Sequence, residues 1–346
     1  MHSSITPAAR PRHAAPRLPR PALLLSLLSG AAALALTLAA SAAAPQVKTQ
    51  SPGWYRMMLG RFEVTVLNDG THPFPVETVM IDVTPGEVAD SLKLDELRLP
   101  IQGSINAFLI NTGAKLVLVD SGAGELYGAC CGKLLANLRA AGYAPEQVDE
   151  VLLTHLHKDH VGGVNHAGKA VFPNAVVRAA RVDADYWLDP DGAAKAPALL
   201  SSFFDSARAS LSPYRAAGRF KPFDGAAELE SGIRAVPEPG HTPGHTGYLV
   251  ESDGQRLLLW GDTVHVAPVQ LRHLRASVKY DNSDTQAWHT RETLFQRAAG
   301  EHLWIGAAHL AFPGLGHLRR DGAAYDWIPI NYEADPAADS GNNTHH

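Results

Sequence analysis

The sequence predicts an α/β protein in which two β-sheets face each other and helices cover their outer faces. Short apolar stretches typical of strands alternate with helical patterns along most of the chain. In addition, "FLINTGAKLVLVDSG" (residues 108–122) and "YLVESDGQRLLLWGDT" (residues 248–263) share one pattern: a strand, a glycine-containing turn and a leucine-rich strand that ends in aspartate beside glycine. Two copies of one hairpin, each followed by helical sequence, indicate a duplicated sandwich.

Nine stretches are rich in β-branched and leucine residues and are bounded by turn residues, as strands are. They are residues 61–67, 106–110, 115–120, 150–154, 174–179, 232–236, 247–251, 255–262 and 303–309. One helix is expected in residues 131–142, where an apolar face repeats before Gly142. Another is expected in residues 283–300, between a capping Asp284 and Gly300.

Residues 1–44 have the layout of a secretory signal peptide. Four arginines and no acidic residue precede an apolar, alanine-rich run that ends in Ala-x-Ala cleavage sites near residue 44. An uncleaved membrane anchor is the alternative, but the alanine and serine content makes it a weak one. We therefore expect a periplasmic or secreted protein without a stable membrane anchor. Residues 45–346 then form one domain with a polar tail from about Asp335, because no linker or charge block divides them.

The charge and the cysteine content of the chain exclude several classes of protein. The formal net charge of the chain is −5, and removal of the four arginines in residues 1–44 leaves −9. No basic stripe offers itself to nucleic acid, so a nucleic-acid partner is not expected. Cys130 and Cys131 are the only two cysteines and are adjacent, so they cannot join distant segments. Either two ordinary thiols or a strained vicinal disulfide remains open.

A metal-binding loop is predicted in "THLHKDHVGG", residues 154–163. Side chains alternate in an extended segment, so His155 and His157 point the same way and can bind one ion together. Asp159 and His160 lie beyond a bend and can reach a second ion, because the glycines that follow allow close backbone approach. A loop that is merely rich in titrating residues is the alternative.

Three further strand ends supply the same ligand types. "PGHTPGH" contains His241 and His245, "LLLWGDT" contains Asp262, and "IGAAHLAFPG" contains His309. Imidazole and carboxylate suit zinc, manganese, iron or cobalt, and the absence of thiolates argues against a closed structural zinc site. The sequence therefore predicts a catalytic site for two divalent ions that share one carboxylate, and we expect zinc in it.

The order HxHxDH, GHTPGH, GD and AAH resembles the metallo-β-lactamase superfamily. "SPGWYRMMLGRFEVTVLNDGT", "AGYAPEQVDEVLLTHLHKDHVGG", "FPNAVVRA" and "AAHLAFPGLGHLR" are also similar, almost collinearly, to methyl parathion hydrolase and its relatives, from about Ser51 to Tyr332. The resemblance implies an αββα sandwich of two mixed β-sheets flanked by helices, a dinuclear metal site, secretion and a homodimer.

The resemblance also implies roles for individual residues. The ligands would be His155, His157 and His241 for one ion, Asp159, His160 and His309 for the other, and Asp262 as the bridge between them. His245 would be a supporting residue rather than a ligand. Asp120 would orient a ligand histidine, although a simple turn-capping role is equally compatible with its position.

Substrate preference depends on the pocket, for which the resemblance implies an aromatic wall of Tyr127, Trp187 and Phe203. Tyr127 replaces the phenylalanine of the pesticide-degrading members, and His265 replaces an aliphatic residue. A polar histidine at an apolar pocket could bind a carbonyl or hydroxyl group, or assist proton transfer to a leaving group. We therefore expect a hydrolase in which a metal-bridging hydroxide attacks lactones and carboxylic aryl esters, with weaker phosphotriester hydrolysis.

The catalytic roles would fall to Asp262, Asp159 and His265. The alternatives are a dedicated organophosphorus hydrolase, a β-lactamase or a thioester hydrolase of the same superfamily, and a metal-binding module without catalytic activity. A nuclease of this fold would require a basic surface, and the net negative charge of the chain argues against one.

Overall fold

The computed structural model describes residues 44–334. The expected signal peptide, apart from Ala44, and the tail from Asp335 lie outside the described residues. The compact unit begins at Ser51. Among the helices of residues 44–334, none combines the length and the apolar character needed to cross a membrane.

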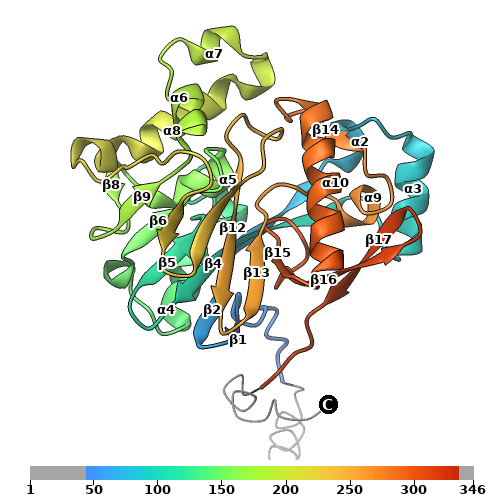
Figure 1. The fold of residues 1–346 in the computed structure, drawn as a ribbon, viewed down its shortest axis with the longest axis horizontal. Coiled ribbons are helices and arrows are strands. Elements are labelled where there is room, and N and C mark those ends of the chain that lie inside the picture. Colours follow the sequence, from blue (N-terminus) through green and yellow to red (C-terminus); the bar gives the residue numbers. More distant parts are fainter. Residues whose placement is uncertain (1–43, 335–346) are drawn as a thin grey trace, which may run out of the picture. The chain divides into compact units, whose positions relative to one another are not determined.

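Two mixed sheets form the centre of this unit (Figure 1). The first sheet has the order β1 (Trp54–Leu59), β2 (Phe62–Phe74), β4 (Ile101–Asn111), β5 (Leu116–Val119), β6 (Glu150–Leu152) and β9 (Val176–Arg178). The second has the order β10 (Glu228–Glu230), β11 (Ile233–Pro237), β12 (Thr246–Ser252), β13 (Gln255–Leu259), β15 (Trp304–Gly306), β16 (Leu315–Asp321) and β17 (Ala324–Pro329). All nine predicted strands are present.

Shorter elements surround the sheets. Two small sheets pair β3 (Met80–Ile81) with β14 (Ser277–Val278) and β7 (Asn165–His166) with β8 (Lys169–Ala170). The α-helices are α2 (Val76–Val79), α3 (Pro85–Leu94), α4 (Leu134–Ala140), α5 (Lys158–Val161), α6 (Arg181–Trp187), α7 (Gly192–Lys195), α8 (Ala198–Ala216), α9 (Ala267–Gln270) and α10 (Asp284–Gly300). The 3₁₀ turns are η1 (Gly128–Cys130), η2 (Pro145–Gln147) and η3 (Gly162–Val164).

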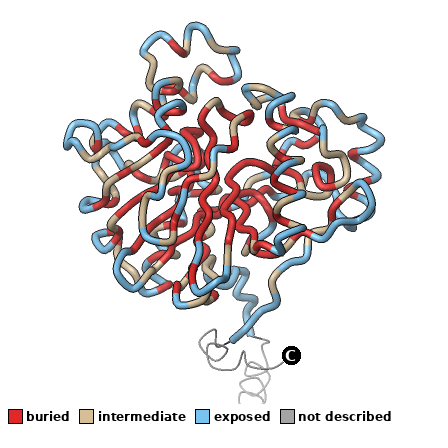
Figure 2. The backbone as a smooth tube through the Cα atoms, in the orientation of Figure 1, coloured by how far each residue is buried: buried red, intermediate tan, exposed pale blue. Residues whose placement is uncertain are grey.

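Three hydrophobic clusters confirm the αββα layering. In β4, Phe108 points into the cluster between the two sheets, whereas Leu109 points to the outer face, where α4 and α8 cover the first sheet. In β12, Tyr248 faces the same inner cluster, and Leu249 faces the cluster that contains α10. Figure 2 shows the resulting run of buried backbone through the middle of the unit. Because both faces of each sheet are buried, the central strands read as nearly continuous apolar runs.

The predicted duplication is also present. β4 and β5 form an antiparallel hairpin, the chain then passes through α4, and β6 pairs parallel to β5. β12 and β13 repeat this hairpin, the chain passes through α10, and β15 pairs parallel to β13. The matching hairpin registers place Asp120 one residue and Asp262 three residues beyond their strands. The two aspartates therefore lie at the same edge of the sandwich, but Asp262 is farther along the chain from the end of its strand than Asp120 is.

One local expectation needs correction, and two prominent elements were not predicted. Helix α10 is capped by Ser283, whose side chain accepts a hydrogen bond from the backbone N–H of Gln286 at 3.3 Å, so Asp284 is the first helical residue and not the cap. The 19-residue α8 and the β16–β17 hairpin were not predicted. Helix α8 mixes serines and charged residues with its apolar face, which weakens the periodic signal.

The glycines of "HVGG" serve close packing. A Cβ atom on Gly163 would lie only 1.9 Å from the carbonyl oxygen of Ser121, and one on Gly162 would lie 2.2 Å from that of Ala123. The Gly163 N–H also donates to the carbonyl oxygen of Gly122 at 3.0 Å. The loops after β5 and β6 therefore touch backbone to backbone, and this contact sets the position of the metal-binding motif.

We predict that Gly163→Ala destabilises the fold by about 1–3 kcal/mol, because the added methyl group must push the two loops apart. Urea unfolding of the purified variant measures the effect. Gly86→Ala is the matched control, since its nearest atom would be 4.0 Å away, in the first turn of α3. A Gly163→Ala midpoint equal to that of the control would contradict the argument.

Candidate metal centre

Four strand ends of the two sheets supply the candidate residues, and all of them meet at one edge of the sandwich. His155 and His157 follow β6, and Asp159 and His160 lie on the single turn of α5. His241 lies in the loop between β11 and β12. The remaining members, Asp262 and His309, follow the parallel neighbours β13 and β15. Carboxyl ends of parallel strands share an edge, so the topology brings these side chains together.

Asp262 lies at the centre of the group. Its Oδ1 is 3.0 Å from Nε2 of His160 and 3.1 Å from Nε2 of His309. Its Oδ2 is 3.2 Å from Nε2 of His241 and 3.7 Å from Nε2 of His155. Nε2 of His309 is also 3.1 Å from Oδ2. Oδ1 therefore faces His160, Oδ2 faces His241 and His155, and His309 lies equally close to both oxygens.

The outer members divide in the same way. His157 presents Nδ1, which lies 3.0 Å from Nε2 of His241. Asp159 Oδ2 is 3.6 Å from Nε2 of His309 and 3.9 Å from Nε2 of His160. Donor atoms within 4.8 Å of one another form three sets: His155, His157, His241 and Asp262; Asp159, His160 and His309; and Asp262, His265 and His309. The first two sets are termed the ligand sets. These two sets match the two predicted ligand groups, with Asp262 between them.

Asp120 and Thr154 connect the two sets from behind. Asp120 Oδ2 lies 2.8 Å from Nδ1 of His160, and the Thr154 hydroxyl lies 2.9 Å from the same oxygen. The Thr154 oxygen is also 3.0 Å from Nδ1 of His155. Since the hydroxyl donates to the carboxylate, it can accept from the His155 ring. Asp120 therefore orients one histidine of each set, and it does so from a left-handed backbone conformation with φ of 60°.

His241 and His309 are held through Nδ1 as well. Nδ1 of His241 lies 2.7 Å from Oδ1 of Asp281, and Nδ1 of His309 lies 2.9 Å from the carbonyl oxygen of Ser104. A histidine that donates its Nδ1 proton in this way presents the Nε2 lone pair to the centre. Asp281 was not found from the sequence, because it lies in a loop without a motif.

His245 supports the Asp262 loop and does not face the cluster of donor atoms. Its Nε2 accepts a hydrogen bond from the backbone N–H of Asp262 at 2.9 Å, and its Nδ1 lies 3.1 Å from the carbonyl oxygen of Glu238. Asp183 has a similar supporting position, because it accepts hydrogen bonds from the backbone N–H groups of Leu156 and Gly244 at 2.9 and 3.1 Å. Burial raises the pKa of Asp183 to about 6. It joins the loops that carry His157 and His241, and no sequence signal marked it.

The donor set fits divalent metal ions. Nε2 of His155, Nε2 of His160 and Oδ1 of Asp262 are buried and make no hydrogen bond among the described residues, although the last two atoms lie 3.0 Å apart. Unpaired buried polar atoms are costly unless something satisfies them, and these three point into one cluster. Imidazole nitrogens and carboxylate oxygens at one buried position are the ligands that zinc and related ions prefer.

The electrostatics of the cluster follow from its single central carboxylate. Burial would raise the pKa of Asp262, but the surrounding imidazoles lower it well below the ordinary value, and His160 has the largest lowering effect. Burial would lower the pKa of His241, but Asp262 and Asp281 outweigh burial and raise the pKa to about 9. Burial lowers the pKa of His155 and His157 well below the ordinary value. Without metal, the cluster therefore holds its protons on the histidines beside carboxylates.

The profile of the metallo-beta-lactamase superfamily matches residues 100–309, which contain every candidate ligand. The chain belongs to this superfamily. The solved structure of the hydrolase AbOPH of the beta lactamase superfamily is 38% identical to it, covers 82% of this chain and 100% of its own, and superposes with a TM-score of 0.79.

Two further relatives have defined reactions. AidC, a dizinc quorum-quenching lactonase solved with its product N-hexanoyl-L-homoserine, is 26% identical, covers 81% of this chain and 98% of its own, and gives a TM-score of 0.76. The atrochrysone carboxyl ACP thioesterase of Aspergillus fumigatus is 30% identical over 184 residues, 53% of this chain. This chain spans 47% of the length of that thioesterase.

This metallo-beta-lactamase superfamily member is a metal-dependent hydrolase related to lactonases. The alternative that the sequence left open, a metal-binding module without catalytic activity, is therefore wrong. The predicted resemblance to the superfamily is confirmed.

A cavity of about 120 Å³ opens beside the metal cluster and is termed the metal cavity. It is lined by Tyr127, Phe203 and His265, as expected, and also by His72, Phe74, Pro75, His157, Asp159, Asp262, Tyr280 and His309. Trp187 does not line it. The Trp187 ring is buried in the core against Phe204 and stands edge-on behind His157, with ring centroids 4.9 Å apart. Its expected place in the pocket wall is therefore wrong, because α6 turns the indole inward.

His265 lies deeper than a rim residue. Its Nε2 is 3.1 Å from Oδ2 of Asp262, and its ring is stacked on that of His309 with centroids 5.2 Å apart. Burial lowers the pKa of His265 to about 4, although Asp262 opposes the shift. The neutral ring can donate from Nε2 to Asp262 and keep Nδ1, which has no partner among the described residues, as an acceptor.

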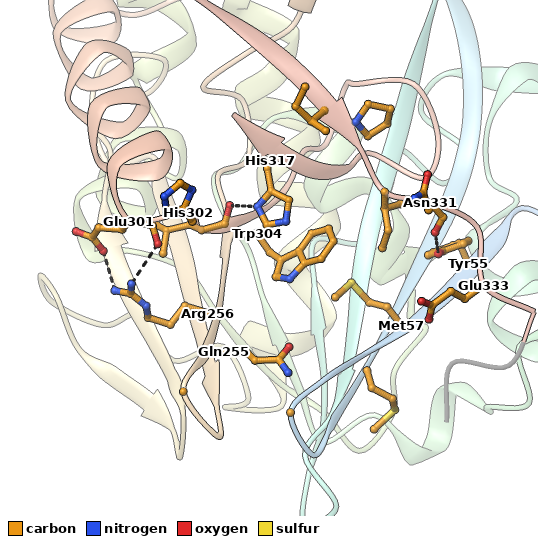
Figure 3. A pocket seen from close by; sticks show the side chains of 17 residues that line it. Tyr55, Met57, Gln255, Arg256, Glu301, His302, Trp304, His317, Asn331 and Glu333 are labelled. Carbon is orange, nitrogen blue, oxygen red and sulfur yellow. Dashed lines mark hydrogen bonds and ion pairs between the residues drawn. The ribbon is translucent and has the colours of Figure 1, made fainter. Parts of the chain in front are cut away.

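Two larger cavities lie elsewhere. A groove of about 810 Å³ between the start of β4, α9 and the β16–β17 hairpin shares His265 and His309 with the metal cavity. Figure 3 shows a cavity of about 700 Å³ at the opposite strand ends, where Gln255 begins β13 and Trp304 begins β15. None of the candidate ligands lines the cavity in Figure 3, so of these two cavities the groove is the one that adjoins the metal centre.

We predict that Asp120→Ala lowers zinc affinity about 10- to 100-fold for both bound ions, because His155 and His160 lose their common support. Competitive titration with a chromophoric chelator and metal analysis of the purified variant measure the loss. Asp149→Ala is the matched control, since Asp149 holds only the backbone N–H of Leu116 at the far end of β5. Unchanged metal content in Asp120→Ala would refute the supporting role.

We also predict that zinc affinity rises with pH. Below about pH 9 the metal-free His241 carries a proton, and an ion must displace this proton before it binds the ring nitrogen. Displacement of one proton weakens apparent affinity by about tenfold for each unit by which the pH falls. Chelator competition at pH 6, 7 and 8 measures the slope, and an affinity that stays constant over this range would contradict the assignment.

Proposed function

We propose that this protein is an exported, dinuclear metal hydrolase that opens lactones and cleaves carboxylic aryl esters, and that hydrolyses phosphotriesters more weakly. The observation that supports it most is the arrangement around Asp262, where one carboxylate stands between two sets of buried imidazoles with unpaired donor atoms. The relationship to AidC, a lactonase, agrees with this substrate class.

The residues of this chain would hold two divalent ions, with zinc as the proposed metal. His155, His157 and His241 would bind one ion, Asp159, His160 and His309 the other, and Asp262 both. Divalent ions in these positions would supply Lewis acidity, which activates water near neutral pH and polarises a carbonyl or phosphoryl oxygen of the substrate. No serine or cysteine nucleophile is needed.

The other roles belong to side chains that line the metal cavity. Asp159 stands at the edge of the second ligand set, close to the phenol of Tyr127, whose pKa is raised by burial and by the Asp159 charge. Tyr127 therefore keeps its proton and can donate it in a hydrogen bond to an oxygen of the substrate. His265 can accept a hydrogen bond at Nδ1 and so receive a hydroxyl group, because its low pKa leaves the ring neutral.

The polar groups of the metal cavity favour esters and lactones over phosphotriesters. Tyr127, His265, His72 and Tyr280 surround a space of only about 120 Å³, which suits a compact lactone ring or small acyl group. A hydrogen-bonding wall discriminates in favour of substrates with oxygen atoms to pair and against apolar ester groups. Phe203 and Phe74 still offer aromatic contact to an aryl leaving group.

Thioester hydrolysis is a second candidate, because the Aspergillus fumigatus relative is a thioesterase. A thioester presents the same carbonyl carbon to the same cavity, so only its larger leaving group distinguishes it. A dedicated organophosphorus hydrolase remains the third alternative, and a β-lactamase the fourth. The kinetic comparison below separates all four.

Export and dimerisation accompany this proposal. The signal peptide predicted for residues 1–44 motivates a periplasmic or secreted location, and the resemblance to methyl parathion hydrolase motivates a homodimer. N-terminal sequencing of the mature protein from the periplasm or medium would test the first, and sedimentation of that protein would test the second.

We predict that the zinc-loaded enzyme has its highest kcat/KM on lactones or aryl esters. The panel contains dihydrocoumarin, an acyl-homoserine lactone, an aryl acetate, an acyl thioester, a β-lactam and methyl parathion. A preference of about 100-fold for methyl parathion would overturn the proposal in favour of a dedicated organophosphorus hydrolase. A similar preference for the thioester or the β-lactam would favour that activity instead.

Two variants test the residue roles on the same panel. Asp262→Asn is expected to remove activity on every substrate, because it takes a charge from the carboxylate that both ligand sets share. His265→Leu is expected to shift the ranking toward methyl parathion, because the cavity becomes less polar. If His265→Leu leaves the ranking unchanged, the pocket argument fails even though the metal assignment stands.

A further inference from the structure

The thiols of Cys130 and Cys131 lie directly behind the wall of the metal cavity. Cys130 ends η1, Cys131 follows it, and both cysteines are free. Cys131 is buried against Ile105 and Ala123, and Tyr127 packs on the same small cluster. Tyr127 lines the metal cavity as well. One residue therefore links the dithiol to the candidate active site.

The two thiols are already in mutual contact. Their Sγ atoms face one another, and the Cys130 thiol donates a hydrogen bond to the carbonyl oxygen of Tyr127 at 3.3 Å. Adjacent Cα atoms are about 3.8 Å apart across a trans peptide, below the usual 4.4–6.8 Å of disulfide-bonded residues. A disulfide here would be strained, and strained disulfides are the readily reduced, reversible ones.

The backbone on both sides of the dithiol is fixed. The Asp69 carboxylate accepts hydrogen bonds from the N–H groups of Ala123 at 2.9 Å and Gly132 at 3.0 Å. Gly70 lies so close that a Cβ atom there would be 2.2 Å from the carbonyl oxygen of Cys130. Strain created at the dithiol cannot spread past these anchors, so it must be taken up by the turn of residues 124–131, which carries Tyr127.

The dithiol borders a surface cavity through Cys131, and Cys130 is partly exposed. A surface cavity of about 450 Å³ is lined by Cys131, Gly128 and Gly132. Cys130 is only half-buried, whereas Cys131 is buried, and burial together with its neighbour raises the pKa of the Cys131 thiol. Attack on a disulfide requires access to the attacking sulfur, so the more exposed Cys130 reacts first.

We propose that Cys130 and Cys131 form an oxidation site, which a low-molecular-weight disulfide RSSR converts into a vicinal disulfide that displaces Tyr127 in the metal cavity. The Cys130 sulfur attacks RSSR, forms Cys130–S–S–R and releases one RSH. The Cys131 sulfur then attacks Cys130 Sγ, closes the ring and releases the second RSH. The protein thiols lose two electrons and two protons, and the oxidant gains both.

Closure of the ring changes the turn in two ways. It removes the thiol hydrogen that Cys130 donates to the Tyr127 carbonyl oxygen, and it forces the 130–131 peptide to adjust between the Asp69 anchors. Tyr127 then leaves its position near Asp159. A displacement of about 1 Å of a positioning group can cost up to about 100-fold in rate, so the oxidised enzyme is expected to be slower.

The test treats the zinc-loaded mature enzyme with oxidised glutathione. The intact mass is expected to fall by about 2 Da, for the two hydrogens lost, without a glutathione adduct. The kcat/KM for an aryl acetate is expected to fall about tenfold and to recover fully with dithiothreitol. The mass measurement needs no substrate, so it stands even if the proposed hydrolase activity is wrong.

Cys130→Ser and Cys131→Ser are the matched controls. Each should keep the activity of the reduced enzyme and lose the response to oxidation, because one thiol can form only a mixed disulfide. If the buried Cys131→Ser variant fails to fold, the half-exposed Cys130→Ser variant carries the comparison alone. A persistent glutathione adduct on the wild-type enzyme, an unchanged mass, or a vicinal disulfide with unchanged kinetics would each overturn the proposal.

Discussion

The Asp262 carboxylate, buried among imidazoles, is the interaction on which the rest of the site depends. A buried charge without partners would be costly, and here the histidines of both ligand sets approach its two oxygens within 3.0–3.7 Å. The same carboxylate is approached by Nε2 of His265, which also lines the metal cavity. The Asp262 side chain therefore pairs with the imidazoles of the cluster and also lines the metal cavity.

Each supporting group has a partner of its own, and the supports join separate loops. His245 fixes the backbone of Asp262, and Asp281 fixes the His241 ring. Asp120 contacts the His160 ring directly and the His155 ring through Thr154. Asp183 joins the loop after β6 to the β11–β12 loop. Because each loop is held to another, the donor atoms can be positioned before any ion binds, as a pre-organised site requires.

Residues that the sequence identified are those whose motif has fixed local spacing. Asp159 and His160 come from one short loop, and His241 and His309 from loops beside apolar strands, so strand ends and ligand types could be read directly. The supporting Asp281 and the cavity residues His72 and Tyr280 could not, because no periodic pattern surrounds them. They reach the site through β2 and the segment after β14, whose packing is nonlocal. The same reason explains Trp187, since the direction of its indole depends on how α6 packs on α8.

By itself, the sequence determined the two-sheet architecture, the duplicated hairpin and the edge at which histidines and aspartates gather. These follow from strand periodicity and from ligand chemistry, which are local properties of the chain. Only the tertiary structure decided which nitrogen each ring presents, that His265 lies against Asp262, and that the adjacent cysteines stand behind Tyr127. Asp262 and His265 are only three residues apart, as are Tyr127 and Cys130, but distant segments fix the loops that carry them. The His265 ring stacks on that of His309, and Asp69 holds the backbone on both sides of the cysteines.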